Sequence, residues 1–182
     1  MSGHSKWSQI KRKKAVTDAK KGRLFSKLSK IIELAAKKGE NPKTNLVLKT
    51  AVEQAKAENM PVANIDRAIK KGSGADMGGS QMEEIIYEAY GPGGAALLIK
   101  SITDNKNRTT AEIKHILSKY GANLSGAGSV KWLFGSVIED GEIKWQPQQT
   151  IKLNPDDDNK LSALLSDLDD QDDISEVYIN SE

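Results

Sequence analysis

The period of the apolar residues changes once along this chain, at a glycine-rich stretch. Residues 72–81, GSGADMGGSQ, hold four glycines and two serines. Before this stretch, apolar side chains recur every three or four residues, which is typical of amphipathic helices. After it, alternation and short apolar runs indicate strands. We therefore expect a basic helical domain at 1–72, a Gly/Ser linker at 73–81 and an α/β domain at 82–182.

The first part is expected to contain four helices. Over residues 20–38, apolar side chains recur at steps of three and four, and Gly39 is a plausible end for this helix. A shorter helix is expected before it, and two more at about 43–59 and 61–72. Short helices joined by tight connections predict a small bundle.

The second part alternates strands with helices. We therefore expect an α+β fold: a small N-terminal helical bundle followed by a ferredoxin-like βαββαβ domain with an extra N-terminal strand. The Asp140-Gly141 pair is a hairpin-turn signal. The expected elements are strand 82–90, strand 95–103, helix 108–121, strand 130–138, strand 142–153, helix 154–170 and strand 174–180.

Charge is sorted along the chain, although the net charge is only +2. Residues 1–72 hold 18 basic and 6 acidic side chains, whereas residues 139–182 hold 3 and 13. A strong positive field at one end predicts a polyanionic partner, and nucleic acids are the main polyanions available. A solvated basic face is the plainer alternative.

The acidic stretch Asp167–Asp173 resembles a calcium-binding loop in composition alone. Gln171 and Tyr178 stand at positions where that loop needs ligands. We therefore expect a solvated acidic face that repels nucleic acid.

The sequence offers little for catalysis. It has no cysteine and two histidines, His4 and His115, and its glycine-rich segments match no phosphate-binding motif. We expect a protein that is not an enzyme and has no cofactor, metal or small-molecule substrate. No apolar run is long enough to span a membrane and no secretory signal is evident, so we expect a cytoplasmic monomer.

The first candidate binding residues lie in the basic start of the chain. Trp7 can stack on a base or ribose, or it can anchor its helix together with Ile10, and both interpretations stay open. The candidates here are His4, Lys6, Trp7, Lys11, Arg12, Lys13 and Lys14.

A second candidate set is a stripe of like charges. Lys20, Arg23, Lys27 and Lys30 follow one another at helical spacing, so they repel one another unless an anionic partner neutralises them. The polar loop TDNKNRT at 103–109 adds Asn105, Lys106 and Arg108 as candidates for contact with phosphate, ribose or a protein partner. The alternative is that Thr103, Asp104 or Asn105 simply caps the following helix.

Several segments together resemble the YebC/PmpR family, which includes the mitochondrial translational activator of cytochrome c oxidase. The resemblance implies an N-terminal helical domain, α/β material after it, and non-enzymatic control of gene expression. The matching segments are GHSKW at 3–7, IKRKKAVTDAKKGRLFSKL at 10–28, NMPVANIDRAIKKGSG at 59–74, YEAYGPGG at 87–94, TDNKNRT at 103–109, GSVKWLF at 128–134 and EVYIN at 176–180.

The chain departs from the family pattern at one place. Members of the family usually carry a third domain between the strand expected at 130–138 and the next one. Here residues 139–142, Glu-Asp-Gly-Glu, close that gap as a tight turn. This chain is therefore a short form that lacks the inserted domain.

The resemblance implies two functions, and the residues suggest a third. One is a ribosome- or rRNA-associated translation factor that relieves stalling on proline-rich stretches; another is a DNA-binding transcriptional regulator. A protein-only adaptor, docking a basic partner through the acidic second domain, is a further alternative. Basic residues are spread over two helices and no convincing helix-turn-helix is evident, which favours RNA.

Overall fold

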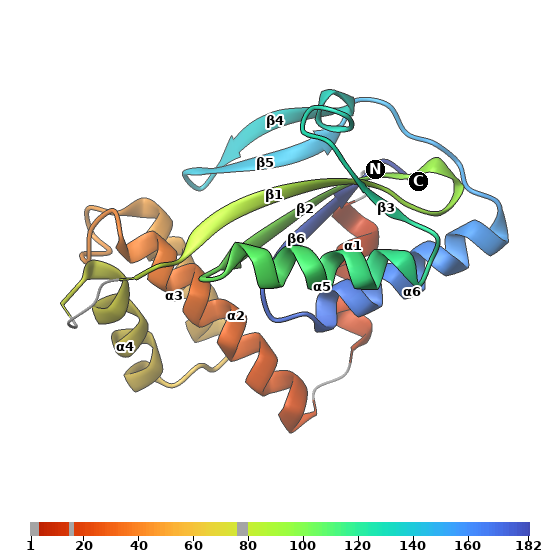
Figure 1. Ribbon diagram of the computed structural model, residues 1–182. Coiled ribbons are helices and arrows are strands. Elements are labelled where there is room, and N and C mark those ends of the chain that lie inside the picture. Colours follow the sequence, from red (N-terminus) through yellow and green to blue (C-terminus); the bar gives the residue numbers. More distant parts are fainter. Residues whose placement is uncertain (1–3, 15–16, 76–79) are drawn as a thin grey trace.

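The computed structural model describes residues 4–14, 17–75 and 80–182, and it confirms an α+β fold (Figure 1). The helices are α1 (His4–Lys13), α2 (Asp18–Ala36), α3 (Leu46–Ala57), α4 (Val62–Ser73), α5 (Lys106–Ser118) and α6 (Pro155–Asp170), with short 3-10 turns η1 (Pro92–Gly94) and η2 (Lys131–Leu133). The strands are β1 (Glu83–Tyr90), β2 (Ala96–Thr103), β3 (Asn123–Ser125), β4 (Phe134–Glu139), β5 (Glu142–Pro147) and β6 (Ile174–Ile179).

Helices α2, α3 and α4 form the expected bundle around an aliphatic core that includes Leu28, Ile32, Leu48 and Ile65. Asn45 joins two of the helices. Its side-chain oxygen accepts a hydrogen bond from Leu48 N (3.1 Å) and caps α3, while its amide nitrogen donates to the Ala35 carbonyl oxygen near the end of α2 (2.9 Å). Because this buried side chain satisfies backbone groups of both helices, it fixes the α2–α3 turn.

Helix α1 departs from the expected bundle. Its Trp7 side chain lies in the core of the sheet domain, with Ile113 and Leu164, and α1 packs against α6 and β6. The ring is 1% exposed there, and burial of so large an aromatic surface stabilises this placement of α1. The helical bundle therefore consists of α2–α4, and α1 crosses to the other half of the chain.

The main sheet has four strands in the order β3-β1-β2-β6, and every neighbouring pair is antiparallel. The ferredoxin-like βαββαβ order is therefore wrong. The strand expected as an extra one, β1, lies inside the sheet, and the strands expected at 130–138 and 142–153 form a separate hairpin, β4–β5. The short strand β3 has no counterpart among the expected elements.

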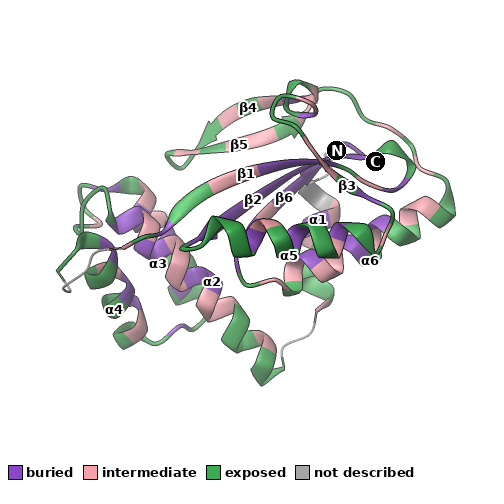
Figure 2. Ribbon diagram, viewed as in Figure 1, coloured by how far each residue is buried: buried purple, intermediate pink, exposed green. Residues whose placement is uncertain are grey.

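Burial on both faces of the sheet explains the separate hairpin. Every residue of β2 is buried, as Figure 2 shows, so both faces need a cover. Helices α1, α5 and α6 cover the face that holds Leu97 and Ile99. On the other face, Leu98 packs with Phe134 and Trp145 of the hairpin. The molecule thus has three layers, and the hairpin is one of them.

The turn of the hairpin is tight. Asp140 and Gly141 have φ angles of 52° and 80°, and positive φ at both positions is the requirement of a type I′ turn. A Cβ atom built on Gly141 lies 3.2 Å from Val47 Cγ2, so the turn lies against α3. Through this contact, the hairpin of the sheet domain packs against the helical bundle.

Candidate nucleic-acid interface

Helices α1 and α2 border a cavity of about 430 Å³ that we call the basic groove. Its wall comes from α1, the first half of α2, the end of α3 and the end of α6. The basic side chains that line it are Lys11, Arg12, Lys14, Lys20, Lys21, Arg23 and Lys27, and the acidic ones are Glu58, Asp169 and Asp170.

The acidic end of α6 pairs with the basic helices. Lys14 Nζ lies 2.9 Å from Asp170 Oδ1, and Arg23 Nη1 lies 2.8 Å from the same atom. Lys27 Nζ lies 3.4 Å from Asp169 Oδ1. The expectation of a solvated face that repels nucleic acid is therefore wrong for this stretch, since its carboxylates neutralise cations of the same chain.

Backbone chemistry explains why the lysines gather there. The last carbonyl groups of a helix have no partner within the helix and carry the negative end of its dipole. Lys14 donates a hydrogen bond to the Ser166 carbonyl oxygen, and Lys27 donates to that of Asp169. Lys27 of α2 thus satisfies one of these last carbonyl groups, and Lys14, which follows α1, adds a second cation one residue before them.

Burial makes Lys27 a structural residue. Desolvation lowers the pKa of Lys27 to about 8, although the nearby Asp169 carboxylate opposes the shift. Lys30, one turn further along α2, pairs with the buried Asp173. The repulsion along the predicted stripe is therefore relieved for Arg23, Lys27 and Lys30 by acids of this chain.

Five basic side chains near the groove remain without such a partner. None forms an ion pair within 4 Å among the described residues, and all except the half-buried Lys20 are exposed. They are Lys11, Arg12 and Lys13 of α1 and Lys20 and Lys21 of α2.

The other candidates of the first helix have structural partners or lie outside the description. Trp7 is 1% exposed, so it anchors α1 and cannot stack on a base. Lys6 pairs with Asp158 at the start of α6. His4 begins α1, and its side chain lies outside the described part of the chain.

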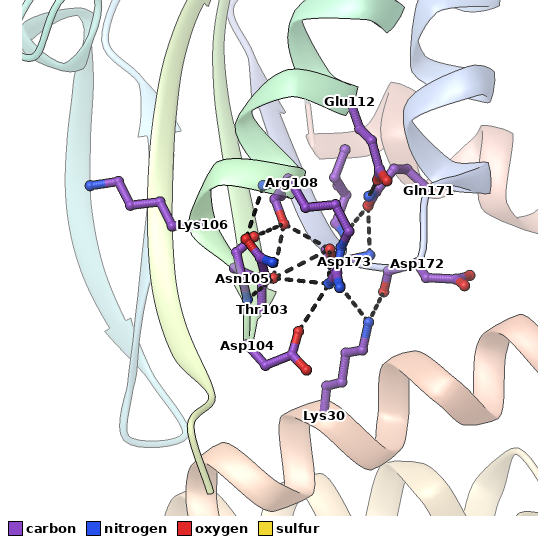
Figure 3. Close-up of polar contacts among 12 residues, drawn as sticks. Lys30, Thr103, Asp104, Asn105, Lys106, Arg108, Glu112, Gln171, Asp172 and Asp173 are labelled. Carbon is purple, nitrogen blue, oxygen red and sulfur yellow. Dashed lines mark hydrogen bonds and ion pairs between the residues drawn. The ribbon is translucent and has the colours of Figure 1, made fainter.

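The loop at 103–109 forms a polar network around Asp173, which Figure 3 shows. The buried Asp173 carboxylate accepts hydrogen bonds from Thr109 Oγ1 (2.7 Å), Arg108 Nη2 (3.1 Å) and Lys30. Burial alone would raise the pKa of Asp173, but these hydrogen bonds, Lys30 first, lower it to about 2. The network ties α5, α2 and the segment before β6 together.

The side chains of the three candidate residues in this loop have different roles. Asn105 caps α5 by accepting a hydrogen bond from Arg108 N (3.1 Å). The Arg108 side chain is held by Asp104 and Asp173. Lys106 is exposed and points away from the network in Figure 3. Of the three, Lys106 alone is free for an external partner.

Sequence reasoning missed two features. Lys21 lines the groove beside Lys20, and extending the basic row by one residue would have found it. Trp132 is 65% exposed, which no periodicity in a strand-like segment can indicate. Within the described ranges, none of the helices combines the length and the apolar character needed to cross a membrane.

Comparison with known proteins gives the family context. The sequence profile described as "TACO1/YebC protein N-terminal domain" matches residues 5–75, and the profile "TACO1/YebC second and third domain" matches 82–137 and 135–181. A crystal structure of a conserved hypothetical protein from Aquifex aeolicus is similar, with a TM-score of 0.82 and 34% identity over 91% of each chain.

Curated relatives carry the name "probable transcriptional regulatory protein". One from Caldanaerobacter subterraneus is 40% identical over 240 aligned positions, which cover 100% of this chain and 98% of the relative. One from Dictyoglomus turgidum is 48% identical over 186 positions, covering 100% of this chain and 72% of the relative.

The length difference agrees with the predicted loss of a domain. An alignment of 240 positions against 182 residues means that the Caldanaerobacter relative has internal residues that this chain lacks. The second profile matches in two stretches that meet within β4, next to the tight turn of the hairpin. This chain is a short member of the TACO1/YebC family.

Proposed function

We propose that this protein is a non-enzymatic regulator of gene expression that binds nucleic acid through the basic groove. The observation that carries the proposal is the set of five basic side chains, on α1 and α2, that have no ion-pair partner among the described residues. The names of the relatives, as regulatory proteins, support the same class. In this proposal the protein acts in the cytoplasm, as a monomer and without a cofactor.

Structured RNA, above all ribosomal RNA, is the favoured target. The unpaired cations come from two helices, and four of the five line the groove, which suits contact with a folded phosphate backbone. Reading a DNA operator needs a helix that presents several polar side chains to base edges in one groove. The DNA-binding alternative draws its support from the relatives' names, and the protein-only adaptor draws less, because Asp169, Asp170 and Asp173 already pair within the chain.

The test is salt-resolved co-sedimentation with ribosomes, run beside binding to duplex DNA. The variant K11A/R12A/K13A removes three cations that have no acidic partner, one of which, Lys11, lies over the Trp7 ring, and K43A/K56A/K70A removes three exposed lysines outside the groove. We expect the first variant to bind ribosomes at least about 10-fold more weakly than wild type. The slope of the logarithm of the binding constant against the logarithm of the salt concentration should become shallower by about 2, and the control should stay close to wild type.

Two results would contradict the proposal. Equal losses in both variants would mean that overall charge, and not the groove, sets the affinity. If the protein ignored ribosomes but preferred one duplex strongly over scrambled DNA, the RNA assignment would be wrong and the transcriptional alternative would stand.

A further inference from the structure

Two exposed aromatic side chains, Trp132 between β3 and β4 and Tyr90 at the end of β1, share one hydrogen-bond acceptor. Trp132 is 65% exposed and Tyr90 is 41% exposed. Trp132 Nε1 and Tyr90 Oη both donate hydrogen bonds to the Ser129 carbonyl oxygen, at 2.8 and 3.0 Å. One backbone oxygen thus fixes the polar edge of each ring. We call this pair the aromatic platform.

The backbone beneath the platform is held by a buried carboxylate. Glu88 of β1, which is 7% exposed, accepts hydrogen bonds from the backbone N–H groups of Gly128 (2.6 Å), Val130 (2.8 Å) and Lys131 (2.8 Å). Charged hydrogen bonds of this kind are strong, and three of them hold the backbone between residues 128 and 131. The platform is therefore ordered before any ligand arrives, which reduces the entropy lost on binding.

The surroundings leave the rings open to a flat ligand. Gly126, Ala127 and Gly128, all exposed, precede the platform, and a Cβ atom built on Gly128 meets no heavy atom within 4 Å. A protein-binding hot spot is normally ringed by further apolar contacts. The exposed aliphatic residues of this hairpin, Ile138 and Ile143, lie instead at its other end, next to the turn.

We propose that the aromatic platform stacks an unpaired base of a nucleic-acid strand. Every base has a π-face, and stacking on an aromatic side chain is worth about 1–3 kcal/mol per base. The platform lies on the hairpin side of the sheet, whereas α1 packs on the opposite side. It is therefore a contact separate from the basic groove. The groove attracts phosphate, and the platform adds a preference for single-stranded regions. The biological setting of this contact rests on the proposed function.

The test compares W132A, W132F and I138A as purified full-length proteins. The probes are a labelled 12-nucleotide single-stranded RNA, its DNA equivalent and the duplex of the same sequence. We expect W132A to weaken single-strand binding about 5- to 100-fold with an unchanged salt slope, W132F to retain most of the affinity, and both to leave duplex binding unchanged. I138A removes an 80% exposed apolar side chain from the same hairpin and should match wild type.

The outcomes separate this inference from the proposed function. Unchanged single-strand affinity in W132A, or an equal loss on the duplex, would overturn the stacking site. An oligomer with an uncharged backbone tests base stacking without any contribution from phosphate. It should quench the tryptophan fluorescence of wild type and of K11A/R12A/K13A, but not that of W132F, which lacks the stacking tryptophan. If K11A/R12A/K13A bound ribosomes as tightly as wild type while the quenching persisted, the proposed function would be wrong and the stacking site would still be supported. A preference for RNA over DNA would assign the ribose hydroxyl a role, and equal binding would assign recognition to the base.

Discussion

At the scale of single residues, Asp173 shows how one buried side chain can join three segments of the protein. It is buried, it accepts hydrogen bonds from α2 and α5, and it lies just before β6. A buried carboxylate with several charged donors stabilises the fold while it is ionised and leaves unpaired cations when it is not. Its titration is therefore linked to folding.

We predict an acid-dependent loss of stability that depends on Asp173. Its pKa falls from 3.8 to about 2 in the folded state, so the stabilisation is fully present above pH 4 and is lost as the pH falls through 2. The expected contribution is about 2 kcal/mol, measured as the free energy of unfolding in urea from pH 5 to pH 2. D173N should lack this part of the pH dependence, whereas D172N, at an exposed position, should retain it. Identical profiles for D173N and wild type would contradict the assignment.

At the scale of elements, α1 depends on one side chain for its place. Trp7 is the residue that α1 contributes to the buried sheet core, with Ile10 packed partly against it. Four basic residues follow Trp7 within two turns, so the position of the groove depends on this anchor.

We expect W7A to lower the free energy of unfolding by about 3–5 kcal/mol and W7F by much less. W7A should also weaken ribosome binding even where the protein is still folded, because α1 then loses its fixed position. Denaturant titration and co-sedimentation measure the two effects. Stability close to that of wild type in W7A would show that α1 is held by its ion pairs instead.

The acidic end of α6 sets the field of the groove. Asp170 pairs with Lys14 and Arg23 at the groove wall. We predict that D170N binds RNA about 2- to 10-fold more tightly than wild type, with a steeper salt slope, because Arg23 loses its acidic partner and Lys14 keeps only Asp169. D66N, on α4, carries the same change in charge at an exposed position outside the groove and should have little effect. Weaker binding by D170N would mean that the aspartate positions the cations.

Sequence patterns predicted the helices and strands better than they predicted which strands pair and which side chains form ion pairs. The alternation around Val137 and Lys144 indicated two strands and their turn, but it could not tell that they leave the sheet, because pairing is decided by what covers β2. The spacing of Lys27 and Lys30 indicated one helix face. Their partners, Asp169 and Asp173, lie more than 140 residues away in sequence, so no local pattern could assign them.

At the scale of the whole molecule, the charge asymmetry of the sequence is partly cancelled in space. The basic first quarter and the acidic end of α6 lie against each other, and five cations near the groove remain without an acidic partner among the described residues. Overall charge therefore describes this protein poorly, and a handful of unpaired side chains determines the field that a partner meets.

The β4–β5 hairpin explains how relatives of different length can share the remainder of the fold. Glu139 and Glu142 are register partners, so the chain leaves β4 and re-enters β5 at adjacent points. Any insert whose two ends lie close together can replace Asp140 and Gly141 without altering a single ladder hydrogen bond. The turn is thus an insertion site at which a folded domain can be gained or lost while the sheet, the platform and the groove keep their positions.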